Sequence, residues 1–139
     1  MNTDMIYQRK RDFEVCGVVG VCAMTKQEFV KEVFSMPTTP VSATVDLVGV
    51  PAIISAKENP KIAEMYNKSS MAAIDGMPIV KIGRRKGLSC DRCAAPDIMG
   101  DVFAEAYACS NDKVCNVSVV AVKKGVIAYL DTHRVITVC

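Results

Sequence analysis

Short apolar runs alternate with amphipathic segments along most of this chain, and no other feature constrains its fold as strongly. The apolar runs, rich in β-branched residues, cover 13–22, 41–50, 71–74, 117–122 and 135–138. Segments with helical periodicity lie between them, at 26–35, 60–68, 78–86 and from Pro96 onward. Strands that alternate with helices are typical of an α/β fold. We therefore expect a Rossmann-like domain with a largely parallel sheet flanked by helices.

The composition fits one folded domain. Half of the 139 residues are apolar, which is enough to bury a core. We expect polar residues 1–12 to form a flexible arm and residues 13–139 to form a single α/β domain. The formal net charge of +2 is too small to indicate a nucleic-acid partner.

The hydropathy of the chain indicates in which part of the cell the protein is expected. No apolar run reaches the roughly 18–20 residues that span a bilayer. The first residues also lack the apolar segment of a secretory signal. We expect a cytoplasmic protein that can still contact a membrane surface.

Asp75 is the first candidate for chemistry. Asp75-Gly76 follows the apolar run 71–74 and precedes a segment with helical periodicity. Open α/β sheets bind ligands at the carboxyl ends of their strands, where a carboxylate can accept a proton from an attacking hydroxyl. Asp-Gly is also a common turn dipeptide, so a structural role stays open.

A basic stretch follows Asp75. Its members are Lys81, Arg84, Arg85, Lys86 and Arg92. Guanidinium groups match the oxygen geometry of diphosphates, and five basic residues within twelve could also contact RNA or anionic lipid. The alternative is a solvated basic loop.

Four cysteines have a spacing that could hold a structural Zn²⁺. Cys90, Cys93, Cys109 and Cys115 form a C-x2-C-x15-C-x5-C pattern. The last spacing is wider than that of most zinc sites. A small zinc-stabilised interaction protein is therefore one alternative, and reduced cysteines in the core are the other.

Two spaced motifs resemble the WecG/TagA/CpsF family of bacterial glycosyltransferases. IDGMPIV at 74–80 resembles the family's Asp-Gly element, and DRCAAPDIM at 91–99 resembles its ERVAG-x-DLM element. The opening segments FEVCGV at 13–18 and MTKQE at 24–28 are also similar to the family's. The resemblance covers about residues 13–130.

The resemblance implies an inverting transfer of an N-acetylhexosamine, often N-acetylmannosamine, from a UDP-sugar. The acceptor is a sugar on a polyprenyl diphosphate, and the product enters cell-surface polysaccharide or teichoic acid. No metal or other cofactor is implied. Asp75 corresponds to the family's proposed base, and Arg92 corresponds to the arginine that faces the diphosphates.

The chain departs from the family at one substrate-binding element and in length. The family's Thr-x-Asn element is matched best by Thr44 and Asp46, which we expect to contribute to substrate binding. An alignment without a gap would instead place Leu47 and Gly49 there. The chain is also much shorter than family members, so it would correspond to their N-terminal, acceptor-side part.

Two further expectations follow from this departure in length. A truncated member could have lost transfer activity and remain as a non-catalytic module that binds diphosphates or an anionic surface. A shortened α/β sheet would also expose apolar edges and faces, so we expect a homo-oligomer.

Overall fold

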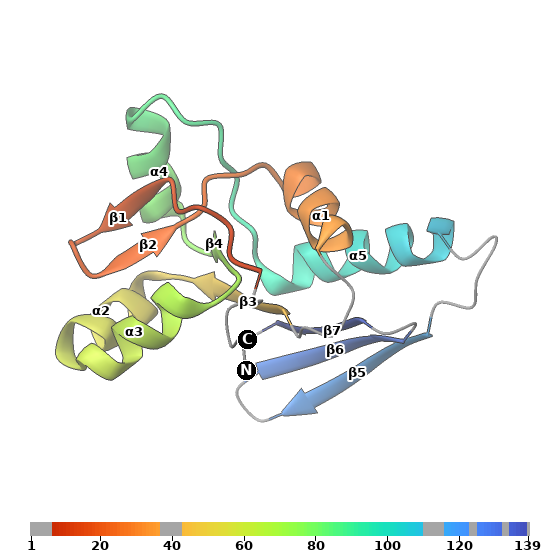
Figure 1. The fold of residues 1–139 in the computed structure, drawn as a ribbon. Helices are drawn as coiled ribbons and strands as arrows, with labels where there is room; N and C mark the ends of the chain where they lie inside the picture. Colours follow the sequence, from red (N-terminus) through yellow and green to blue (C-terminus); the bar gives the residue numbers. More distant parts are fainter. Residues whose placement is uncertain (1–6, 37–42, 110–115, 123–124, 132–133, 139) are drawn as a thin grey trace.

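The computed structural model describes residues 7–36, 43–109, 116–122, 125–131 and 134–138, and the side chains up to residue 108. The strands are β1 (Phe13–Val15), β2 (Val19–Val21), β3 (Ala43–Val48), β4 (Met71–Ile74), β5 (Asn116–Val122), β6 (Gly125–Asp131) and β7 (Arg134–Val138). The helices are α1 (Lys26–Ser35), α2 (Val50–Glu58), α3 (Pro60–Lys68), α4 (Met77–Arg85) and α5 (Ala95–Cys109). Figure 1 shows α1 beside α5 and α2 beside α3. The α/β prediction is confirmed.

The larger sheet is mixed, with the order β4-β3-β7-β6-β5. Strand β3 pairs in parallel with β4 and with β7, whereas β6 is antiparallel to both β7 and β5. The prediction of a largely parallel sheet is therefore wrong. Two residues separate β5 from β6, and two separate β6 from β7. Connections this short join antiparallel neighbours, because a parallel pair needs a crossover of a dozen or more residues.

Strands β1 and β2 form a separate antiparallel hairpin next to β4. Its turn places Cys16 and Gly17 at φ values of 52° and 66°, the positive pair that suits a right-twisted hairpin. Cys22 follows β2, forms a parallel bridge to Ala73 and donates its backbone N–H to the carbonyl of Ala72 at 2.7 Å. The hairpin therefore lies beside β4.

Local sequence signals explain where two of the helices begin. Thr25 and Glu28 form the capping box that their spacing predicts, and α1 follows directly. Asn59 accepts a hydrogen bond from the backbone N–H of Lys61 and precedes Pro60, the first residue of α3. Helix α2 was not predicted, because its first residue, Val50, continues the apolar run that forms β3.

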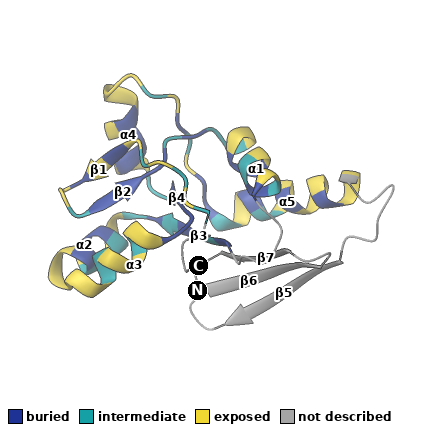
Figure 2. Ribbon diagram, viewed as in Figure 1, coloured by how far each residue is buried: buried dark blue, intermediate teal, exposed yellow. Residues whose placement is uncertain are grey.

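Helices cover both faces of β3 and β4. Because side chains alternate along a strand, Met71 and Ala73 pack with α1 and α5, whereas Ala72 and Ile74 pack with α2 and α4. All four residues of β4 are buried, and Figure 2 shows this strand in the buried colour. Among the described residues, no helix is long and apolar enough to cross a membrane.

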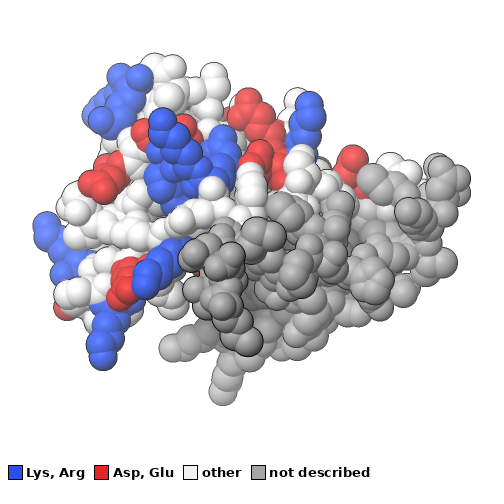
Figure 3. All heavy atoms as spheres, in the orientation of Figure 1, with Lys and Arg blue, Asp and Glu red and all other residues white. Residues whose placement is uncertain are grey.

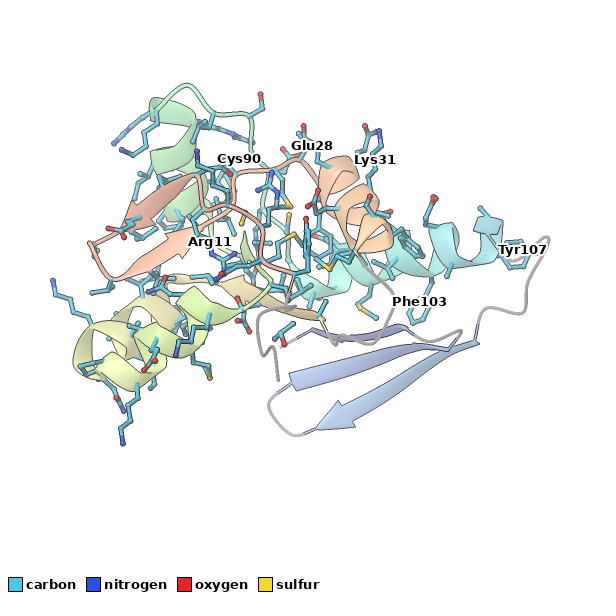
Figure 4. The ribbon with its side chains drawn as sticks, in the orientation of Figure 1. Arg11, Glu28, Lys31, Cys90, Phe103 and Tyr107 are labelled. Atoms are coloured by element: carbon cyan, nitrogen blue, oxygen red, sulfur yellow. The ribbon has the colours of Figure 1, made fainter. Side chains whose placement is uncertain are left out.

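Arg11 anchors the segment that precedes β1. Its guanidinium group donates to the backbone carbonyls of Ser69 at 2.6 Å, Tyr66 at 3.1 Å and Arg9 at 3.1 Å. The labelled side chain points toward the centre of the molecule in Figure 4. Hydrogen bonds of Gln8, Arg9 and Asp12 also join this segment to the folded body, and residues 1–6 of the expected arm lie outside the described residues.

Candidate functional site

Asp75 lies where the parallel strands β3 and β4 end. Its backbone N–H donates to the carbonyl of Val48, the last residue of β3, at 2.8 Å. Its side chain is one-third exposed, but Oδ1 is buried and accepts no hydrogen bond within the part of the chain that the structure describes. The carboxylate thus reaches solvent at the carboxyl edge of the sheet, as its sequence context predicts.

Two helices begin beside Asp75 with glycine at the N-cap. Gly49 precedes α2 and Gly76 precedes α4, and no side chain caps either helix. A Cβ built on Gly49 would lie 3.2 Å from the carbonyl oxygen of Asp75, and one built on Gly76 would lie 3.7 Å from Cα of Gly49. The two glycines therefore form a floor of bare backbone. Helix N-termini carry partial positive charge, so this floor favours an anionic group.

Arg92 supplies the nearest cationic side chain. Its Nε lies 3.5 Å from Oδ1 of Asp75, and its side chain is about half exposed. The segment before α5 holds it there, because the backbone N–H of Cys93 donates to the carbonyl of Ile74 at 2.7 Å. The structure thus brings together Asp75 and Arg92, the two residues that the family resemblance placed in one site.

Thr44 lies away from this site, near the start of β3, whereas Asp46 lies two residues before Val48 on the same strand. In the register of β3 and β4, Val48 lies beside Ile74, whereas the backbone N–H of Thr44 donates to the hydroxyl oxygen of Ser70, before β4 begins, at 3.0 Å. Thr44 comes four residues before Val48, which is about 13 Å along an extended strand. The expectation that Thr44 and Asp46 contribute to substrate binding stays a prediction.

Gly49 takes the position beside Asp75 instead. This matches the alignment without a gap, in which Leu47 and Gly49 stand where the family has Thr-x-Asn. Leu47 packs against the core cluster that contains α1 and α5. Neither residue has a polar side chain, so the site lacks the side-chain hydrogen bonds that this element would provide.

Arg84 and Arg85 lie at the far end of α4. They come seven and eight residues after Met77, about 10–12 Å along the helix. Arg84 donates from Nε to the carbonyl of Cys90 at 3.1 Å and pairs with Asp91 at 3.4 Å. Lys and Arg side chains gather over α4 at the top left of Figure 3. This basic end of α4 is separate from Asp75, and only Arg92 of the basic stretch reaches it.

Cys90 and Cys93 are both buried, in different core clusters. Burial raises the pKa of the Cys90 thiol, and it raises the pKa of Cys93 to about 12. Among the described residues, no three His, Cys, Asp or Glu side chains come together as a metal site. The side chains of Cys109 and Cys115 lie outside the described residues. The two described thiols therefore behave as core side chains.

One comparison with known proteins identifies the family. The family model described as Glycosyl transferase WecG/TagA/CpsF family matches residues 13–130 of the 139-residue chain. The chain belongs to this glycosyltransferase family. No curated protein and no solved structure matches it. For this member of the WecG/TagA/CpsF family, the matched range contains Asp75, Arg92 and both glycine-capped helix starts.

The paired glycine floor was missed at the sequence level, although a signal for it exists. In this WecG/TagA/CpsF chain, a buried strand is followed twice by Gly-x-Pro, at 49–51 and at 76–78. Proline in the first turn of a helix has no N–H that needs a partner, and glycine allows close backbone approach. The repeated pattern therefore indicates two helix starts at neighbouring strand ends.

Proposed function

We propose that this chain transfers an N-acetylhexosamine, such as N-acetylmannosamine, from a UDP-sugar to a sugar on a polyprenyl diphosphate. The product would enter cell-surface polysaccharide or teichoic acid. The single observation that carries the proposal is the Asp75–Arg92 pair beside two helix N-termini that no side chain caps. A base and a source of positive charge meet there at one solvent-accessible edge, in a chain of a glycosyltransferase family.

The proposed reaction is a direct displacement that inverts the anomeric carbon. Asp75 accepts the proton of the acceptor hydroxyl, whose oxygen forms the new bond to the anomeric carbon. The bond from that carbon to the phosphate oxygen breaks, and UDP leaves with the electron pair. General-base catalysis of this kind contributes about 10²–10⁴-fold in rate.

Arg92 and the two helix N-termini would stabilise the diphosphate. A guanidinium group pairs well with phosphate oxygens, and the partial positive charge of a helix N-terminus adds to it. Arg92 approaches Asp75 through Nε, and its side chain is half exposed. We propose that it contacts a diphosphate while it remains near the base.

The test is transfer of labelled N-acetylhexosamine from UDP to a synthetic polyprenyl-diphosphate sugar. Asp75→Asn should abolish turnover without changing thermal stability, because its side chain makes no hydrogen bond that the described structure contains. Asp101→Asn, at an exposed aspartate of α5, is the matched control and should stay active. Turnover by Asp75→Asn at the wild-type rate would refute the assignment of the base.

A second candidate function is a non-catalytic module that binds diphosphates or an anionic surface. The basic end of α4 favours it, because Lys81, Arg84, Arg85 and Lys86 are all exposed. Such a module would bind anionic lipid vesicles in a salt-sensitive way and would do so equally well as Asp75→Asn. Binding of this kind without any transfer would favour the module, and it would also explain contact with the inner face of a membrane.

We also propose that the chain forms a homo-oligomer around a Rossmann-like unit of β3, α2, α3 and β4. The exposed apolar side chains of Ile54 on α2 and Met65 on α3 support self-association, since each is more than half exposed. Light scattering at micromolar concentration tests this proposal. A monomeric mass would contradict it.

A further inference from the structure

The segment from Leu88 to Cys93 carries Arg92 to the edge of the sheet where Asp75 lies. The Arg92 side chain is about half exposed, and its Nε lies 3.5 Å from Oδ1 of Asp75. An exposed ion pair contributes little to holding two side chains together. The position of the guanidinium group therefore depends on how the backbone on either side of it is held.

Asp91, the residue before Arg92, is bound through its backbone and through both carboxylate oxygens. Its backbone N–H donates to the carbonyl of Met24 at 3.0 Å. Its Oδ2 accepts the backbone N–H of Lys26, the first residue of α1, at 3.2 Å, and its Oδ1 pairs with Nη2 of Arg84 at 3.4 Å. A carboxylate suits the partial positive charge of a helix N-terminus. Asp91 thus joins the segment to α1 and to α4.

Arg84 and Cys93 complete this attachment. Arg84 also donates from Nε to the carbonyl of Cys90 at 3.1 Å, so it holds both residues that precede Arg92. On the other side, the backbone N–H of Cys93 donates to the carbonyl of the last residue of β4 at 2.7 Å. The exposed Arg92 is therefore fixed through its neighbours on both sides.

Direct binding of a substrate by Asp91 or Arg84 is the alternative. Asp91 lies in the wall of a cavity of about 950 Å³, which residues of α1 and α5 also line. Both of its carboxylate oxygens already have protein partners, and a carboxylate repels the phosphates of a UDP-sugar. Arg84 in turn already donates to two protein acceptors. These contacts favour a role in positioning over a role in binding.

We propose that Asp91 is a positioning residue that acts through Arg92. Its carboxylate, held by α1 and Arg84, fixes the backbone from which the Arg92 guanidinium group reaches a diphosphate. Without this carboxylate the segment would be held less firmly, and Arg92 would spend less time beside the leaving group. The inference rests on the proposed function, in which Arg92 stabilises the diphosphate, and it names a residue on which that contact depends.

Amide hydrogen exchange of the full ¹⁵N-labelled chain tests the attachment without any substrate. In Asp91→Ala, the Cys93 amide should exchange about tenfold faster than in the wild-type chain, the effect of one lost hydrogen bond to a charged group. The Cys22 amide, which donates to the carbonyl of Ala72 at 2.7 Å, should keep its rate. Equal acceleration at Cys22 would indicate a loss of global stability and would overturn the proposal. An unchanged rate at Cys93 would overturn it as well.

Turnover in the transfer assay tests whether Asp91 acts through Arg92. Asp91→Ala should lower kcat/KM for the UDP-sugar by up to about 100-fold, the effect of a misplacement of about 1 Å. In the Arg92→Ala background the same substitution should have no further effect, because the group that it positions is absent. Asp91→Glu keeps the carboxylate and should restore most of the wild-type value, and Asp101→Asn is again the control.

The outcomes separate this inference from the proposed function. Equal losses of kcat/KM from Asp91→Ala with and without Arg92 would overturn the positioning role, because a merely structural effect is additive. A folded wild-type chain without turnover would refute the proposed function alone. The exchange rates of Cys93 and Cys22 would then still decide whether Asp91 holds the segment that carries Arg92.

Discussion

Replacement of Gly83 by alanine should destabilise the fold, although it places a better helix former inside α4. Gly83 is buried, and a Cβ built on it would lie 2.8 Å from Sγ of Cys90 and 3.3 Å from Cε1 of Phe13. Figure 4 labels Cys90 near the top of the molecule, beside α4. Real Cβ atoms do not approach sulfur this closely, so a neighbour has to move.

The two neighbours have little freedom to move. Cys90 is 2% exposed, its Sγ donates to the carbonyl of Val80 at 3.5 Å, and its own carbonyl accepts from Arg84 Nε at 3.1 Å. Phe13 is buried within the same cluster. Overpacking of a core costs about 1–3 kcal/mol, whereas Gly→Ala within a helix contributes about 1 kcal/mol. The free energy of unfolding should therefore fall by up to about 2 kcal/mol in Gly83→Ala.

Urea unfolding with a matched glycine measures this effect. Gly100 lies within α5, and a Cβ built on it would meet nothing within 4 Å. Gly100→Ala should therefore stabilise the chain, by up to about 1 kcal/mol. Cys90→Ala removes the sulfur, so adding Gly83→Ala to it should cost less than Gly83→Ala does in the wild-type chain. Stabilisation by Gly83→Ala, or the same cost with and without Cys90, would refute the reasoning.

Three other changes test separate parts of the structure. Burial raises the pKa of Asp46, so the native chain keeps this proton to higher pH than the unfolded chain, and its stability falls as pH rises between the two pKa values. The stability difference between Asp46→Asn and the wild-type chain should therefore favour the variant more at neutral pH than below pH 3.8, and thermal unfolding at several pH values measures it. Arg11→Met leaves three backbone carbonyls without their charged donor, so the free energy of unfolding, measured by urea denaturation, should fall by about 2–4 kcal/mol. Lys10→Met, at the exposed neighbouring residue, is the control and should change it by less than about 0.5 kcal/mol. Elemental analysis should find no stoichiometric zinc, because Cys90 and Cys93 pack in separate clusters, and about one zinc ion per chain would contradict this.

Local signals in the sequence predicted local structure well. The capping box of Thr25 and Glu28 predicted the start of α1, since both hydrogen bonds join residues three apart. Asp75 was expected at the carboxyl end of a short buried strand, and β4 ends at Ile74. Both features depend on a few neighbouring residues, so the amino-acid pattern alone carries them.

Features that depend on pairing between distant segments were predicted less well. A strand's pattern of apolar residues does not tell which of its residues lies beside a given partner. The register of β3 against β4 decides this, and it places Gly49 rather than Thr44 beside Asp75. The start of α2 was missed for a related reason, because Val50 extends an apolar run whose strand ends at Val48.

The glycine floor beneath Asp75 has an evolutionary consequence. Its chemistry comes from backbone groups of Gly49 and Gly76, which no substitution can alter while the fold is kept. A larger residue at Gly49 would meet the carbonyl of Asp75 at 3.2 Å. Inherited changes in the shape of this site would therefore arise on the rim, where the side chains of Val50 and Met77 are exposed. Descendants of this chain would diverge at these two positions while Gly49 stayed the same.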